Sequence, residues 1–293
     1  MRALAPLAAL ALCVAPSLLA ADDEPRPKLE AWPELSRAEE RSAKAELARV
    51  RQARTPEMAD EGHAALVEIG AGAAPLVLPV LGKERDEDAL ERLAAVLDDL
   101  TDERHTRLLG AEFEHDDGVV RTYCLLRVAR FPDPGLLAGA EAALERMDGL
   151  EEREHRDYDE HEHWAAALAA TSAGSTAGLG RLVERAVEDW AEEGEAMRLA
   201  LAGAKGAEAT AAVAELLDGA ARRELVAGLR VIAACGSRDE AVPVVRPHLD
   251  SSDNSIRIAA INALRGIVDG DPPLERLSVF DAIEHANRWK ARL

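Results

Sequence analysis

The chain carries nearly the same sequence pattern twice, at residues 109–131 and 245–268, and this duplication constrains its fold more than any other feature. Each copy reads as the apolar end of a short helix, an Asp-rich turn, and a second amphipathic helix that opens with Val-Arg or Ile-Arg. The offset between the copies corresponds to about four periods of roughly 34 residues, a period typical of helical repeats. The duplication therefore predicts a stacked array of helices.

The composition favours helices throughout. Hydrophobic residues make up 48% of the 293 residues, which is enough to bury a core, but only 3% are aromatic. Ala, Leu, Glu and Arg are abundant, and no convincing period-two alternation indicates strands. We therefore expect an all-α protein of six or seven helix pairs, counting about 12 residues for each helix.

The charge balance limits the partners. With 35 Lys and Arg against 55 Asp and Glu, the formal net charge is -20. Nucleic-acid binding requires clustered basic residues, so this class of partner is excluded, and an anionic membrane surface is disfavoured for the same reason. The charge either steers basic partners toward the protein or simply keeps a monomeric array soluble.

The first 21 residues form a separate segment. Arg2 precedes an uncharged apolar run from Ala3 to Ala20, and acidic residues follow. This pattern predicts a secretory signal peptide at 1–21 and an exported protein, periplasmic or secreted, without membrane insertion after cleavage. A segment retained as an anchor is the alternative. Residues 22–35 read as an extended, charged and Pro-rich leader, and the array occupies 36–293.

Cysteine usage fits an export route without disulfides. Once Cys13 is removed with the signal peptide, Cys124 and Cys235 remain, both on the apolar sides of expected helices. They are separated by roughly three repeats, too far for a bond that requires Cα atoms within about 7 Å. We expect both to be buried core residues.

Several stretches resemble HEAT repeats. The run 63–81 matches the pattern that these repeats show across a repeat junction, and 241–267 resembles one whole unit, with Pro243 in its first helix. The matching residues are Ala65, Leu66, Ile69, Gly70, Ala73, Pro75 and Leu76 in the first run, and Ala259, Ala260, Ala263 and Leu264 in the second. The resemblance implies a right-handed α-solenoid of stacked antiparallel helix pairs. Residues 274–293 are expected to form a terminal cap helix.

The resemblance also assigns roles to the repeated Asp and Arg residues. In HEAT repeats, a turn Asp and the following Arg tend to form a ladder between neighbouring repeats. Carried over to this chain, the structural ladder consists of Asp116, Asp117 and Arg121 in one copy and Asp250, Asp253 and Arg257 in the other.

The charged stretch at 149–164 is the least repeat-like part and holds the candidate metal ligands. On a helix, His155, Asp159 and His163 share one face, and His with Asp suits zinc. The three residues span about 12 Å at 1.5 Å per residue, so one ion cannot easily bind all of them. A solvated charged helix is the competing interpretation.

The function expected from these features is binding of a protein partner of unknown identity. In a HEAT-like stack the second helices line the concave face, so we expect the partner to meet Arg127, Arg130, Asn262 and Arg265. The sequence thus predicts an exported, non-enzymatic scaffold without a cofactor. Two alternatives are a metal-binding or metal-sensing module and an enzyme-associated protein resembling the HEAT-type lyases that attach tetrapyrroles.

Overall fold

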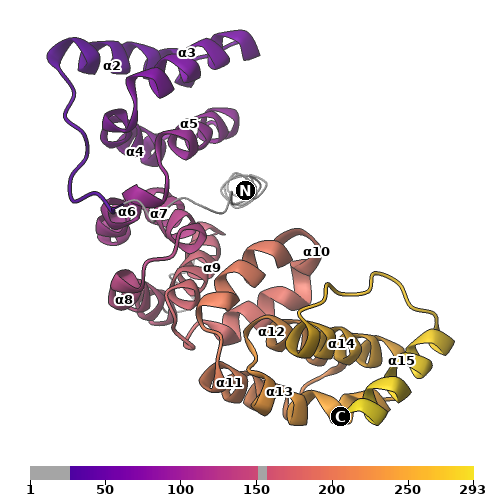
Figure 1. The fold of residues 1–293 in the computed structure, drawn as a ribbon. Coiled ribbons are helices and arrows are strands. Elements are labelled where there is room, and N and C mark those ends of the chain that lie inside the picture. The colour runs from indigo at the N-terminus through magenta and orange to yellow at the C-terminus, as the bar shows by residue number, and fades with distance from the viewer. Residues whose placement is uncertain (1–26, 151–156) are drawn as a thin grey trace. The chain divides into compact units, whose positions relative to one another are not determined.

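The structure, a computed structural model, describes residues 27–150 and 157–293, without the side chains of 157–159. Every regular element in these ranges is a helix (Figure 1), so the prediction of an all-α protein is confirmed. The predicted signal peptide lies outside the described residues. Two compact units divide the chain within one helix, the first reaching Ala169 and the second covering 170–293.

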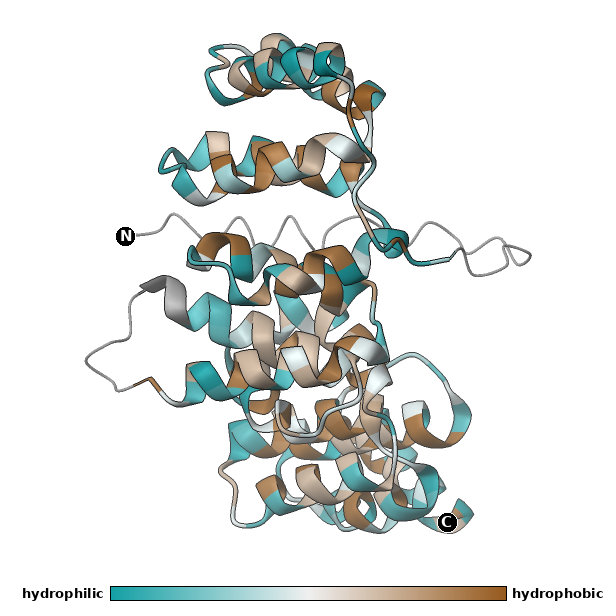
Figure 2. Cartoon of the chain, turned by 90° about the vertical axis from the view of Figure 1, so that its left-hand side faces the viewer, coloured by the Kyte–Doolittle hydropathy of each residue, from teal (hydrophilic) through white to brown (hydrophobic). Residues whose placement is uncertain are grey.

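Unit 1 consists of short helices that pack against near neighbours along the chain. Its α-helices are α2 (Arg37–Arg51), α3 (Pro56–Ile69), α4 (Ala74–Lys83), α5 (Glu87–Leu100), α6 (Thr106–Gly110), α7 (Gly118–Arg130), α8 (Leu137–Asp148) and most of α9 (Asp157–Ser172). Short helical turns join them: η1 (Ala71–Ala73), η2 (Glu103–His105), η3 (Ala111–Glu114) and η4 (Pro134–Leu136). Apolar and polar residues alternate in bands along these helices (Figure 2), as a packed helical layer requires.

Unit 2 also consists of helices that follow one another closely along the chain. It holds α10 (Leu179–Gly203), α11 (Ala207–Leu217), α12 (Arg222–Cys235), α13 (Arg238–Val245), η6 (Arg246–Asp250), α14 (Asn254–Leu264), η7 (Arg265–Asp269) and α15 (Val279–Arg292). Helix α12 packs against both α10 and α14, and α11 packs against α13, so helices α10 to α14 contact their second neighbours along the chain.

Helix starts follow the capping signals in the sequence. Ser36 accepts a hydrogen bond from the Glu39 amide, and the Glu39 carboxylate accepts one from the Ser36 amide, which completes a capping box. Thr55 caps α3 through the Met58 amide, with Pro56 at the first helical position. These local bonds satisfy amide groups that a helix cannot pair internally, and so they fix where α2 and α3 begin.

The duplicated patterns fold alike. Asp117 and Asp253 each cap the following helix, accepting from the amide two residues on at 2.9 and 2.8 Å. In each copy the arginine four residues later donates a 2.6 Å hydrogen bond to the carbonyl six residues before it: Arg121 to His115, and Arg257 to Ser251. The sequence duplication therefore reflects one local structure used twice.

The end of the leader is held against unit 1. The Leu29 amide donates to the Arg104 carbonyl at 2.8 Å, and the Trp32 ring stacks on His105 with centroids 5.5 Å apart. Pro33 and Leu35 then pass over Gly72 in η1, where a Cβ atom would lie 2.5 Å from the Pro33 carbonyl oxygen. The described part of the expected leader, residues 27–35, therefore forms a strap that contacts both η1 and η2.

Helix α15 covers the last helices only in part. Ala282, Ala286 and Trp289 are buried, as expected for a cap, whereas Phe280 is 76% exposed and Ile283 44% exposed. The cap therefore buries small residues and one indole and leaves apolar side chains in solvent.

No single helix among the described residues is long and apolar enough to cross a membrane. The segments Pro56–Ile69 and Ala71–Lys83, bent by 108°, meet the length and composition criteria as a pair.

Candidate functional site

A buried polar cluster in unit 1 surrounds Arg127, one of the residues expected on a partner-binding face. Arg127 is only 2% exposed. Its guanidinium lies 3.2 Å from an Asp98 carboxylate oxygen and donates to the Asp98 and Thr101 carbonyls at 3.1 and 2.5 Å. Tyr123 donates its hydroxyl to Asp98 at 3.0 Å. Arg127 therefore does not reach the surface and instead ties α7 to the end of α5.

Burial shifts the titration of this cluster. Desolvation raises the pKa of Asp98, although Arg127 and Tyr123 both favour its charged form. Desolvation, together with the Asp98 charge, holds the pKa of Tyr123 well above its usual value. Because solvent and ligands are excluded from these groups, the cluster has a structural role rather than a catalytic one.

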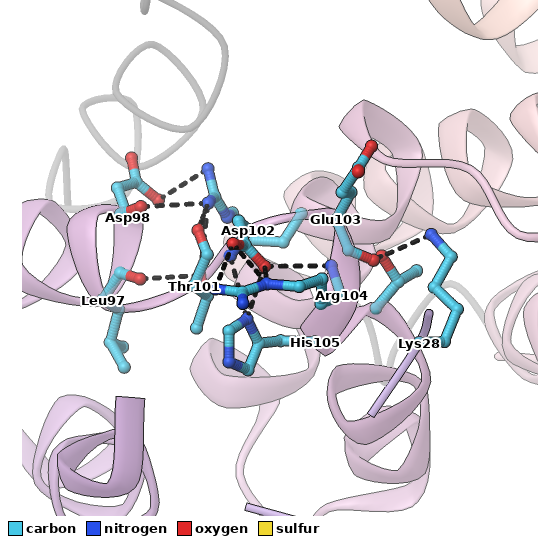
Figure 3. Close-up of polar contacts among 10 residues, drawn as sticks. Lys28, Leu97, Asp98, Thr101, Asp102, Glu103, Arg104 and His105 are labelled. Carbon is cyan, nitrogen blue, oxygen red and sulfur yellow. Dashed lines mark hydrogen bonds and ion pairs between the residues drawn. The ribbon is translucent and has the colours of Figure 1, made fainter. Parts of the chain in front are cut away.

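A second polar cluster follows directly in the sequence (Figure 3). Asp102 caps η2 and binds both Arg104 and His105, with 2.8 Å between a carboxylate oxygen and His105 Nδ1. Lys28 reaches the carbonyl of Glu103 at 2.7 Å from the strap side. His105 is buried and stacks on Trp32, so it contributes to holding the strap in place.

Glu162 lies at the centre of a charged contact between helices. Its side chain is fully buried, and it accepts two hydrogen bonds from Arg121, at 2.6 and 2.7 Å, and one from Arg146 at 2.8 Å. This contact joins α7, α8 and α9. The interpretation of 149–164 as a solvated charged helix is therefore wrong at Glu162.

The predicted metal ligands are not brought together in the part of the chain that the structure describes. His163 is nearly buried, with Nε2 2.7 Å from a carboxylate oxygen of Asp148. His155 and the Asp159 side chain lie outside the described residues. Within those residues, no group of three or more His, Cys, Asp or Glu side chains is placed to hold a metal ion. A metal site at His155, Asp159 and His163 stays a prediction.

The predicted ladder residues mostly contact other partners. Arg121 binds Glu162 rather than Asp116 or Asp117. Asp253 pairs with Arg222 at the start of α12, at 2.6 Å, and Asp250 pairs with Lys290 of α15 at 2.9 Å. Ion pairs between helices therefore exist at Asp250 and Asp253, but not with the expected arginines.

The other residues that were expected on the concave face form contacts within their own region of the chain. Asn262 accepts from the Leu274 amide at 2.8 Å and donates to its carbonyl at 3.2 Å. Arg265 donates to the Pro272 carbonyl and pairs with Asp271, both at 3.1 Å. The two residues thereby fix the segment before α15. Arg130 is partly exposed beside the Phe131 ring, and desolvation and the nearby Arg127 charge lower its pKa.

An accessible group of side chains lies on unit 2, around Trp190. Helix α10 departs from helical geometry at Asp189, with φ -128° and ψ 30°, immediately before Trp190. The indole then lies over Gly194, where a Cβ atom would be about 3 Å from the ring. Glycine at position 194 therefore lets the ring lie along the helix, where a larger residue would press on it.

Two arginines lie over this indole. The guanidinium carbons of Arg198 in α10 and Arg230 in α12 are 5.6 and 5.7 Å from the ring centroid, within cation–π range. Desolvation lowers the pKa of Arg230. Among the residues that the structure describes, neither arginine forms an ion pair or a hydrogen bond, whereas the nearby Arg185 binds Glu193 through two hydrogen bonds, at 2.7 and 2.8 Å. In an acidic chain, two cations against one indole, with no carboxylate partner among the described residues, form a candidate anion site.

Sequence reasoning missed this site. Trp190 and Arg198 are eight residues apart, two turns on one helix face, which is a weak signal. Arg230 comes from another helix, and the kink at Asp189 that sets the indole has no sequence signature. The proximity of the three side chains required the folded chain.

No family model matches the chain, and no curated protein sequence matches it. A solved structure of human deoxyhypusine hydroxylase in complex with glycerol resembles it over 87% of this chain and 98% of that one, with 17% sequence identity and a TM-score of 0.33. That protein has a HEAT-repeat-like helical fold. The likeness is too distant to assign the hydroxylase reaction to this chain.

This comparison corrects two predictions. The sequence predicted an exported scaffold without enzymatic function, but a solved structure that resembles the chain is that of an enzyme. The non-enzymatic scaffold is therefore not proposed for this chain.

Proposed function

We propose that the chain is an enzyme-associated helical-repeat protein that binds a carboxylate-bearing ligand at Trp190, Arg198 and Arg230. Its helix pairs form a right-handed, HEAT-like α-solenoid, and the protein is exported through residues 1–21. The observation that supports the ligand class is the convergence of two arginines, without carboxylate partners among the described residues, on one indole.

The chemistry of the site favours a carboxylate. A guanidinium offers several donors in a planar fork that matches the two oxygens of a carboxylate. Partial desolvation of Arg230 costs free energy, and a bound anion offsets that cost. The indole restricts the positions of both cations, so less side-chain entropy is lost when the anion binds.

The ligand class agrees with the tetrapyrrole alternative drawn from the sequence. Linear tetrapyrroles carry two propionate carboxylates on a conjugated framework, so each arginine has a carboxylate to bind. The protein then holds the tetrapyrrole for an enzymatic step, and the carboxylates provide the anchoring.

The test compares biliverdin with its dimethyl ester, which keeps the conjugated framework and loses both charges. Isothermal titration calorimetry measures the affinity of each compound for the full chain. We expect the diacid to bind at least tenfold more tightly than the ester, since a charge-assisted hydrogen bond contributes about 1.5 to 3 kcal/mol. Equal affinities for acid and ester would contradict the proposal.

Variants locate the site. Arg198→Gln and Arg230→Gln should each weaken diacid binding by roughly tenfold, or about 1.4 kcal/mol, without changing ester binding. Arg223→Gln, an exposed arginine on α12, removes the same charge and is the matched control. If all three variants lose affinity equally, the effect is only long-range electrostatics and the assigned site is wrong.

A further inference from the structure

An ion pair bridges the kink in α10. Arg185 precedes the non-helical residue Asp189 by four positions, and Glu193 follows it by four. Two parallel hydrogen bonds join the two side chains, from Arg185 Nε to Glu193 Oε2 at 2.7 Å and from Nη2 to Oε1 at 2.8 Å. A bidentate pair of this kind fixes both the distance between its partners and their orientation.

The spacing of this pair differs from that of ion pairs on regular helices. Side chains three or four positions apart are neighbours on a helix, whereas positions eight apart are separated by about 12 Å along the axis. Arg185 and Glu193 are eight positions apart, and the backbone between them leaves helical geometry at Asp189. The pair therefore stabilises the kinked form of α10 over a straight one.

Arg185 also contacts the kink itself. Its guanidinium lies 3.1 Å from a carboxylate oxygen of Asp189 and 3.6 Å from one of Glu188. The Glu193 side chain is 14% exposed and that of Arg185 30% exposed. Because water screens such a pair less than a fully exposed one, its contribution to holding the kink exceeds that of an ordinary surface ion pair.

The kink sets the position of the indole. Trp190 follows Asp189 directly, and the glycine that its ring covers, Gly194, follows Glu193 directly. The ion pair and the ring therefore depend on the same turn of the helix. A change in the backbone at Asp189 would carry the indole away from Gly194 and from the arginines that lie over the ring.

We propose that Arg185 and Glu193 are positioning residues of the anion site. By pairing across the kink, they hold the Trp190 indole in the place where two arginines meet it. Those arginines come from different helices, α10 and α12, and the indole is the surface that both contact. This inference rests on the function proposed above, and it gives the ion pair a role in binding without contact to the ligand.

The affinity for biliverdin separates positioning from charge. The variant Glu193→Gln removes a negative charge near the site, so electrostatics alone predicts tighter binding of the diacid. Loss of positioning predicts the opposite. We expect binding to weaken roughly three- to tenfold, because a ring that the ligand must order lowers the affinity. Equal or tighter binding of biliverdin by Glu193→Gln, measured by calorimetry on the full chain, overturns the proposal.

The indole N–H resonances test the positioning without any ligand. In the proton–nitrogen correlation spectrum of the full chain, Trp190→Phe assigns the Trp190 resonance. We expect Arg185→Gln and Glu193→Gln to shift or broaden this resonance and to leave those of the other tryptophans in place. Arg181→Gln is the matched control, because it removes the same charge from the same helix and its pair with Glu184 is exposed.

Two spectroscopic results would overturn the positioning role. The first is a Trp190 resonance that stays unchanged in both variants of the pair, or that Arg181→Gln shifts equally. The second is an equal change in all four tryptophan resonances, which would show a general loss of structure. Equal affinities of the unaltered chain for biliverdin and its dimethyl ester would instead contradict the proposed ligand class. The Trp190 resonance would still decide whether the ion pair positions the ring.

Discussion

Arg121 binds Glu162 through two parallel hydrogen bonds, from Nε to Oε1 at 2.6 Å and from Nη2 to Oε2 at 2.7 Å. The Arg146 guanidinium donates a third bond to Oε1 at 2.8 Å. The carboxylate is fully buried, so these donors replace its hydration. Since Arg121, Arg146 and Glu162 come from three different helices, their contact fixes how α7, α8 and α9 pack.

Replacing Glu162 with Ala should destabilise unit 1. The change leaves two arginines without their shared carboxylate, and breaking a buried ion pair costs roughly 3–5 kcal/mol. Because both arginines keep some contact with solvent, we expect the lower end, about 3 kcal/mol, measured by urea unfolding. Glu184→Ala breaks an exposed pair with Arg181 and serves as the control, with an expected loss below about 1 kcal/mol. Equal losses for the two variants would contradict a structural role for Glu162.

Asp133 should make stability depend on acidic pH. Desolvation raises its pKa, but hydrogen bonds from the Gly135 amide and from Arg107 outweigh this effect and lower the pKa overall. A carboxyl whose folded pKa is depressed stabilises the fold above its unfolded pKa, about 3.9, and loses that contribution as pH falls through the folded value.

We therefore expect Asp133→Asn to lower the unfolding free energy by a constant amount above about pH 5, and the difference from wild type to shrink as pH falls below about 4. Chemical unfolding at a series of pH values measures this difference. If the difference in unfolding free energy grows as pH falls, the pKa of Asp133 is not lowered in the folded protein.

The buried cysteines should be inert in the folded protein. Desolvation holds the pKa of Cys124 well above its usual value and raises that of Cys235 to about 12. Only the thiolate reacts with alkylating agents, so neither residue should be modified by iodoacetamide at pH 8 until the chain unfolds. Mass spectrometry with and without denaturant measures this. Rapid labelling of Cys235 in the native protein would indicate that α12 opens locally.

The fold was largely predictable because helix signals are local. Ser36 and Thr55 cap helices through bonds within three residues, and the duplicated Asp117 and Asp253 do the same in both copies. The sites were less predictable because their contacts join distant parts of the chain. Arg127 matches a surface position by helical spacing, yet it is buried because Asp98 lies opposite on α5.

The leader illustrates the same limit. Its Pro-rich composition predicts an extended segment but not the surface on which that segment lies. Trp32 stacks on His105, which is more than seventy residues away in the sequence. The close approach of Pro33 to Gly72 depends on the position of η1. Such contacts have no local pattern, so only the folded chain reveals them.

Trp32 should control how firmly the strap is held. Stacking on His105 contributes about 0.5 to 1.5 kcal/mol beyond the buried area of the ring. Trp32→Ala should therefore speed hydrogen exchange of the Leu29 amide, which is bonded to the Arg104 carbonyl, by roughly tenfold or more. Glu30→Gln is the control, since Glu30 is 82% exposed and its pair with Arg107 at 3.3 Å contributes little. If Glu30→Gln accelerates exchange as much as Trp32→Ala, the strap is held by charge rather than by the ring stack.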